Sequence, residues 1–117
     1  MEVIQEKARD VGRLIAQTDE YKAIRRANEQ LSNDREAVTL LNRIQEIQEQ
    51  LQASLQRGEE PGQEEQDRFE SIMQELQGMT VYQGMVAAQS NFDRLMKRIN
   101  EEIGKGIEAG EQSRIIL

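Results

Sequence analysis

The side chains that could carry chemistry in this 117-residue chain are carboxylates, hydroxyls, lysines and arginines, because it contains neither cysteine nor histidine. The missing cysteines exclude disulfides, thiolate catalysis, cysteine-ligated iron–sulfur clusters and cysteine-type zinc sites. The missing histidines remove the commonest general base and the commonest transition-metal ligand. The composition therefore predicts a non-enzymatic protein without a cofactor.

Glutamates at helical spacing are the remaining candidates for metal binding. Glu46 and Glu49 are three residues apart, and Glu101 is next to Glu102. Di-metal helical bundles combine inward glutamates with Glu-x-x-His motifs, and half of that ligand set is missing here. Glu46 and Glu49 also fall between apolar positions, where a helix would turn them toward water. We therefore expect no metal site.

Two small basic clusters are the candidates for nucleic-acid contact. Direct readout of RNA or DNA usually combines a broad basic face with stacking aromatic residues. The net charge of −7 and the aromatic content of 3% argue against such a face. Contact with RNA would require both clusters to gather on one surface: Arg25, Arg26, Arg94, Lys97 and Arg98.

The elements that must position these side chains are all helices, because apolar residues recur every three or four positions and never alternate over a useful length. We expect an all-α, elongated bundle of about five helices. Capping residues at Thr18–Asp19 and Ser32–Asp34, and a break at Gly58–Gly62 that holds the only proline, separate them. The expected helices span residues 2–16, 20–31, 35–57, 63–76 and 81–107.

The two longest predicted helices, 35–57 and 81–107, carry the clearest apolar stripes and should form a long antiparallel hairpin. A thin rod of this kind leaves part of its stripes uncovered, so a homodimer or higher homo-oligomer is the expected remedy; a monomeric bundle is the alternative. The residues expected to pack or make contacts are Leu41, Ile44, Ile47 and Leu51, with Phe92, Leu95, Ile99 and Ile103 opposite.

The length suits one domain, which we expect over residues 1–110, followed by a short tail, 111–117, with an apolar end. The first residues do not resemble a signal peptide, and no stretch approaches the 18 or so apolar residues of a membrane span. The expected location is therefore the cytoplasm, without membrane association.

Several segments together resemble the YlbF/YmcA-like family of small helical bacterial regulators, which includes YheA-type proteins of unknown function. The resemblance is carried by Thr18-Asp19-Glu20-Tyr21-Lys22, Leu31-Ser32-Asn33-Asp34, the Gln-rich stretch 41–51, Arg57-Gly58-Glu59-Glu60-Pro61, Ala88-Gln89 and 95–107. It implies an all-α, self-associating cytoplasmic adaptor in competence, sporulation and biofilm control. The implied partners are a YaaT-type protein and a ribonuclease, in a complex linked to iron–sulfur clusters.

The resemblance and the composition disagree at one point, because this chain has no cysteine to ligate such a cluster. Two functional hypotheses follow. The first is a protein–protein interaction adaptor with a regulatory role. The alternative is an RNA-processing accessory factor that touches RNA through the basic clusters.

Overall fold

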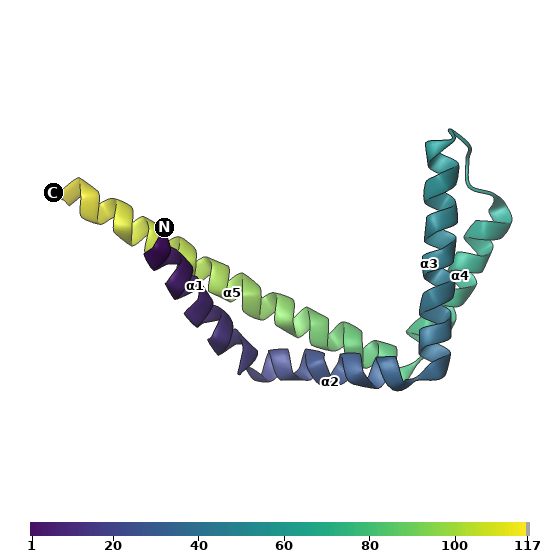
Figure 1. Ribbon diagram of the computed structural model, residues 1–117, viewed down its shortest axis with the longest axis horizontal. Helices are drawn as coiled ribbons and strands as arrows, with labels where there is room; N and C mark the ends of the chain where they lie inside the picture. Colours follow the sequence, from purple (N-terminus) through teal and green to yellow (C-terminus); the bar gives the residue numbers. More distant parts are fainter. Residues whose placement is uncertain (117) are drawn as a thin grey trace. The chain divides into compact units, whose positions relative to one another are not determined.

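The computed structural model describes residues 1–116, and the side chains of residues 1–112. Within that part the chain forms five α-helices and no strand, which confirms the all-α prediction (Figure 1). The helices are α1 (Glu2–Ala16), α2 (Asp19–Asn33), α3 (Arg35–Gln56), α4 (Gln63–Gln77) and α5 (Thr80–Ile116). No helix among the described residues is both long enough and apolar enough to cross a lipid bilayer.

The first four helices begin and end within two residues of the predicted positions, whereas α5 continues nine residues beyond Ile107. Glycines 104, 106 and 110 do not end it, because each costs only about 1 kcal/mol in a helix and the residues between them are good helix formers. Residues 111–116, predicted as a separate tail, therefore extend α5. The apolar side chains of Ile115, Ile116 and Leu117 lie outside the described residues.

The chain divides into two compact units. The hairpin unit comprises residues 25–86, and the terminal unit comprises residues 1–24 with 87–117. The single domain predicted over residues 1–110 stays a prediction.

In the hairpin unit, α3 and α4 run antiparallel and pack against each other (Figure 1). Their shared core consists of Leu40, Ile44 and Leu76, flanked by the half-buried side chains of Leu41, Phe69, Ile72, Met73, Met79 and Tyr82. An antiparallel hairpin is thus present, but its second arm is α4 and not the predicted segment 81–107.

The short connection after α3 explains this choice of partner. Gly58 has a φ of 75°, a left-handed conformation that glycine adopts without steric cost. The Gly58 N–H donates to the Leu55 carbonyl at 3.1 Å, and the Glu59 N–H donates to the Ser54 carbonyl at 2.9 Å. These two bonds form a Schellman motif, which reverses the chain at once and brings α4 back along α3.

Asp34 caps the start of α3, as the capping cluster predicted. Its Oδ1 accepts a hydrogen bond from the Ala37 N–H at 3.0 Å. Replacing Asp34 by Ala should cost about 1 kcal/mol of unfolding free energy and lower Tm by roughly 4 °C, measured by circular dichroism at 222 nm. Asp34→Asn keeps an acceptor and should lose much less; equal losses in both variants would contradict the capping role.

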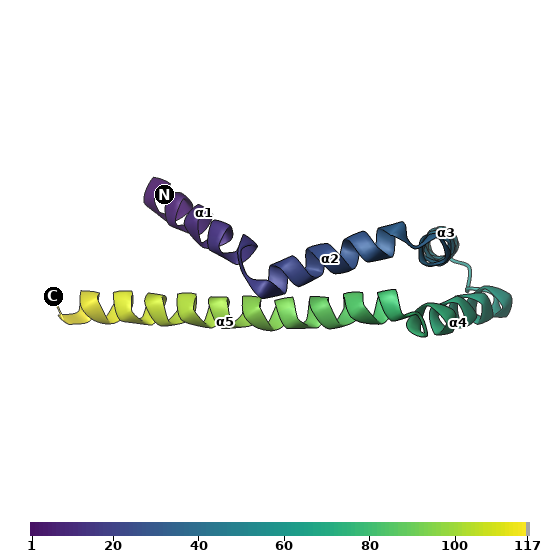
Figure 2. The ribbon, with the colours of Figure 1, turned by 90° about the horizontal axis from the view of Figure 1, so that it is seen from below.

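In the terminal unit, α5 meets the start of α2 through an aromatic pair. The rings of Tyr21 and Phe92 lie 6.1 Å apart and are tilted by 53°. Thr18 fixes the entry to α2, because its Oγ1 accepts from the Tyr21 N–H at 3.2 Å and donates to the Ile15 carbonyl at 2.6 Å. Helix α1, in contrast, buries none of its residues. Figure 1 draws it across α5, whereas Figure 2 shows it moving away from α5 toward Met1.

Candidate interaction surfaces

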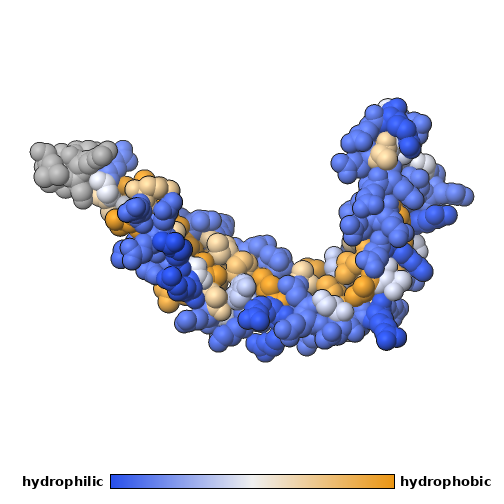
Figure 3. All heavy atoms as spheres, in the orientation of Figure 1, coloured by the Kyte–Doolittle hydropathy of each residue, from blue (hydrophilic) through white to orange (hydrophobic). Residues whose placement is uncertain are grey.

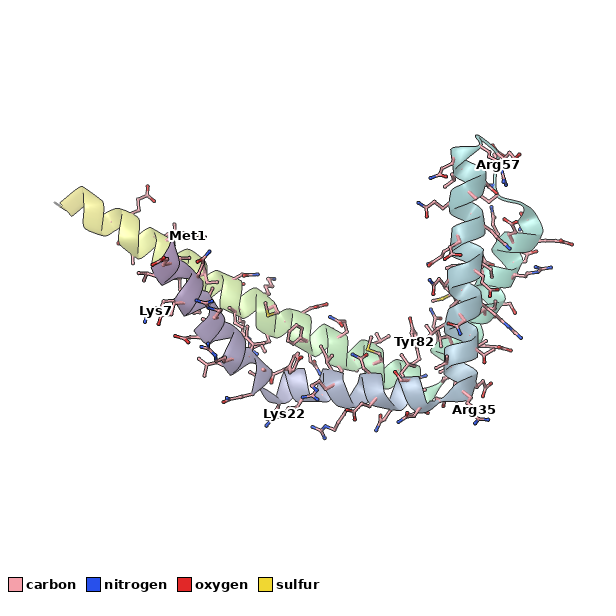
Figure 4. All side chains as sticks on the ribbon, viewed as in Figure 1. Met1, Lys7, Lys22, Arg35, Arg57 and Tyr82 are labelled. Carbon is pink, nitrogen blue, oxygen red and sulfur yellow. The ribbon has the colours of Figure 1, made fainter. Side chains whose placement is uncertain are left out.

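The carboxylates and lysines of the described residues are spread along the helices. No group of three or more Asp and Glu side chains there is placed to hold a metal ion. Glu102 instead pairs with Lys105, whose Nζ donates to Oε1 at 3.0 Å. Lys7 and Lys22 project outward from their helices (Figure 4). Surfaces suited to binding are therefore the candidate functional features.

The first is an apolar surface on the terminal unit, which we call the α1–α5 surface. It includes a groove of about 620 Å³ between the two helices, with apolar walls and one charged residue of each sign. The groove is lined by Val11, Leu95, Arg98, Ile99, Glu102 and Ile103. Further large aliphatic side chains of the same two helices are exposed: Val3, Ile4 and Leu14 on α1, and Ile103 and Ile107 on α5. Apolar atoms gather where α1 overlaps α5 in Figure 3.

The spacing of apolar residues along α5 explains why its far end is uncovered. Between Ala88 and Ile99 successive apolar residues of this face are 4, 3 and 4 positions apart, close to the 3.6-residue repeat of a helix. All four of these residues are buried or half-buried: Ala88, Phe92, Leu95 and Ile99. Beyond Ile99 the apolar residues, Ile103 and Ile107, follow at intervals of four positions. Each therefore lies about 40° further around the helix than the one before it. Exposure rises accordingly, to 54% at Ile103 and 67% at Ile107.

The second surface is a groove of about 410 Å³ on the hairpin unit, which we call the hairpin groove. Its lining combines apolar and polar side chains from both arms: Arg43, Glu46, Ile47, Gln50, Arg68, Ser71 and Ile72. Ile47 is only 7% exposed, so it forms part of an apolar floor. In the described structure neither Arg43 nor Arg68 pairs with a carboxylate, whereas Arg57, at the hairpin tip (Figure 4), pairs with Glu59 at 3.6 Å.

The predicted basic residues are all exposed, but carboxylates lie among part of them. Arg94 and Arg98 line a depression of about 400 Å³ in the terminal unit together with Asp19 and Glu20. The Arg94 Nη2 donates to the Asn91 Oδ1 at 2.9 Å. Lys97 is exposed on the same helix, whereas Arg25 and Arg26 are exposed on α2 within the hairpin unit. A single basic patch formed by all five stays a prediction.

The predicted packing residues divide between the two units. Leu41, Ile44, Ile47 and Leu51 lie on α3, where Ile44 and Ile47 are buried and the other two are half-buried. Phe92, Leu95 and Ile99 are half-buried on α5, and Ile103 is exposed. The prediction missed Arg43 and Arg68. One signal was available: with Arg57, they are the only basic residues between positions 36 and 93.

Comparison with known proteins shows which family this chain belongs to. The sequence model of the family described as "Control of competence regulator ComK, YlbF/YmcA" matches residues 4–108. The chain belongs to the YlbF/YmcA family. The resemblance inferred from the capping and hairpin motifs is thereby confirmed.

Related proteins match this chain over nearly its whole length. A UPF0342 protein of Staphylococcus saprophyticus is 25% identical over 105 residues, which cover 90% of this chain and 92% of the relative. A UPF0342 protein of Pediococcus pentosaceus is 26% identical with the same coverage of both chains. A solved structure, described as a protein of unknown function (DUF964) from Bacillus stearothermophilus, matches with a TM-score of 0.67 at 18% identity. It covers 90% of this chain and 92% of its own, and supports the fold.

Proposed function

We propose that this member of the YlbF/YmcA family is a cytoplasmic regulatory adaptor that acts by binding another protein through the hairpin groove. The description of the family names control of a competence regulator, which supports a regulatory role. The observation that supports the groove is its pair of arginines, one on each arm, which flank an apolar floor and have no carboxylate partner within the described structure.

The chemistry of the groove suits a partner segment that carries carboxylates beside apolar side chains. Arginine is enriched in the cores of protein interfaces, because its planar guanidinium binds carboxylates with two parallel hydrogen bonds. The two arginines stand out within a unit that has 12 Asp and Glu against 6 Arg in residues 25–86. From Arg43 to Gln50 the groove extends over about 10 Å of α3, which matches two turns of a docked helix.

The family resemblance suggests a YaaT-type protein or a ribonuclease as the partner to test first. This chain has no cysteine, so any iron–sulfur cluster in such a complex would take its cysteine ligands from other chains.

Reversal of the two groove charges should weaken partner binding. We expect the variant Arg43→Glu/Arg68→Glu to bind a YaaT-type protein at least about tenfold more weakly than the native chain, because like charges would face the partner's carboxylates. The measurement is titration of the purified proteins by isothermal calorimetry. Both positions are exposed, so the helical circular dichroism should be unchanged.

The matched control is Arg25→Glu/Arg26→Glu, which makes the same charge change in the same unit outside the groove. It should bind as the native chain does. If both double variants weaken binding equally, the general charge of the protein and not the groove would be responsible, and the proposal would be overturned. RNA added at low salt should produce no gel shift with any of the three proteins, since acidic residues predominate.

A further inference from the structure

The two arginines of the hairpin groove stand at opposite ends and on opposite arms, and this placement specifies what a partner must carry. We infer that the groove binds a helix in which two carboxylates, six residues apart, flank one large aliphatic residue. The order along the partner is Asp/Glu-x-x-aliphatic-x-x-Asp/Glu. A partner so defined rests on the function proposed above, and it narrows that function from an unspecified protein to a recognisable sequence pattern.

The packing of Leu76 shows how the two arms of the hairpin are aligned. Leu76 on α4 packs with both buried leucine and isoleucine side chains of segment 40–44 on α3, so it lies level with the middle of that segment. The arms run antiparallel (Figure 1), and Arg68 comes eight residues before Leu76, which places it level with Gln50. Arg43 lies about 10 Å nearer the start of α3. The two arginines therefore mark the two ends of the groove.

The apolar floor lies midway between the arginines. By the same alignment Ile72 is level with position 46 of α3, next to Ile47 on the other arm. Ile47 is buried and Ile72 is half-buried, and both line the groove. One large aliphatic side chain that enters between the arms would contact both isoleucines, and its burial would supply the apolar part of the binding free energy.

The hand of the helix decides which arm lies on which side of the groove. Arg43 faces the groove, and Ile44, which lies about 100° further around α3, is buried against α4. On the side nearest a viewer, the residues of a rising right-handed helix follow one another from left to right. A viewer who faces the groove with α3 rising therefore sees α4 on the right. Arg43 is then at the lower left and Arg68 at the upper right.

A docked helix reaches both arginines only when its carboxylates are six residues apart. Six residues rise about 9 Å and fall about 120° short of two full turns, so the second carboxylate moves from the left flank to the right flank of the buried side. Seven residues leave both carboxylates on one flank, and eight rotate the wrong way. The residue three positions from each carboxylate faces the floor. Either direction of the docked helix gives the same result, because the pattern is symmetric.

Glu46 makes the groove selective against more closely spaced carboxylates. It lies on the α3 arm at about the level of the floor. In a helix parallel to α3, a carboxylate four residues after the one at Arg43 would lie beside Glu46, where like charges repel. In a helix that runs the other way, a carboxylate four residues after the one at Arg68 would face the α4 arm near uncharged Ser71. Carboxylates four residues apart therefore engage only one arginine.

Two short peptides of identical composition test the spacing, each held helical by a hydrocarbon staple on its outer face. The first carries Glu-Ala-Gln-Leu-Ala-Gln-Glu, with its carboxylates six residues apart. The second carries Glu-Ala-Gln-Leu-Glu-Ala-Gln, with its carboxylates four residues apart. Fluorescence anisotropy with the full chain should show the first bound at least about tenfold more tightly, because it pairs with both arginines. Equal binding of the two peptides would overturn the inference.

Reversed charges provide the matched second measurement. The variant Arg43→Glu/Arg68→Glu should bind the peptide Lys-Ala-Gln-Leu-Ala-Gln-Lys more tightly than its counterpart with lysines four residues apart, whereas the native chain should not distinguish the two. General attraction to an acidic protein cannot produce this preference, since both lysine peptides carry the same charge. Absence of the reversed preference in a variant with native helical circular dichroism would show that these two positions do not contact the peptide charges, and would overturn the inference.

Failure of the pattern and failure of the proposed function give different results. If a YaaT-type protein binds through Arg43 and Arg68 but the acidic peptides bind equally, the pattern is overturned and the adaptor function stands. If the peptides are distinguished through those arginines but the YaaT-type protein binds both native chain and double variant equally, the pattern is supported and that partner does not use the groove.

Discussion

Replacing Leu76 by Ala is expected to lower the free energy of unfolding by about 3 kcal/mol and Tm by roughly 10 °C. Leu76 is 1% exposed and is the largest fully buried side chain among the described residues. It packs between α3 and α4 with Leu40 and Ile44, so Ala would lose these apolar contacts and leave a cavity in the core. Thermal unfolding followed at 222 nm and urea unfolding would both report the loss.

The matched control is Leu55→Ala, which makes the same chemical change on α3 at a side chain that is 65% exposed. It should change the free energy of unfolding by less than about 0.5 kcal/mol. Similar losses at both positions would mean that Leu76 contributes no more to the stability of the hairpin than an exposed leucine does, and would contradict its place in the core between α3 and α4.

Introducing a carboxylate at Ile44 should have the largest effect and unfold the hairpin unit. Ile44 is 9% exposed within the core cluster, so Ile44→Asp would bury a charge among Leu40 and Leu76 at a cost of at least about 4 kcal/mol. Loss of helical circular dichroism at 25 °C is the expected readout. Ile44→Val, which keeps the apolar contact, should cost only about 1 kcal/mol.

Introducing Asp at Ile47, three residues after Ile44, offers an internal comparison. Ile47 is 7% exposed, but it lines the hairpin groove beside Arg43 and Arg68, whose charges would partly compensate a carboxylate. Ile47→Asp should therefore lose about 1–2 kcal/mol less than Ile44→Asp. If Ile47→Asp proves the more destabilising, the arginines do not face that position.

The helices themselves could be predicted because they depend on neighbours in sequence. Asp34 marks the start of α3 by accepting a backbone hydrogen bond three residues on, and Gly58 marks its end by adopting a left-handed conformation. Both signals can be read from a few consecutive residues. Helix α5 continues beyond the predicted end at Ile107, because Gly104 and Gly106 weaken a helix only slightly.

The pairing of helices could not be predicted in the same way. The apolar stripe on residues 35–57 could pack equally well against the apolar stripe of α4 or that of α5. Periodicity alone therefore did not distinguish the two helices as its partner. A short connection decides in favour of α4, because the Schellman motif at Gly58 returns the chain along α3 immediately. The candidate sites depend on this choice: Arg43 and Arg68 are 25 positions apart and share a groove only because α3 and α4 are paired.

The all-helical fold, the absence of cysteine and histidine chemistry and the resemblance to the YlbF/YmcA family could all be inferred before the structure was known. These properties follow from residue types, from capping over a few residues and from the 3.6-residue period. The spacing already predicted that Ile44 packs, but the tertiary structure was needed to show that its partner is α4, that Ile103 is exposed and that Arg43 and Arg68 line one groove. The physical reason is that burial depends on which distant helix covers a stripe, and the same apolar spacing serves a covered and an uncovered face equally well.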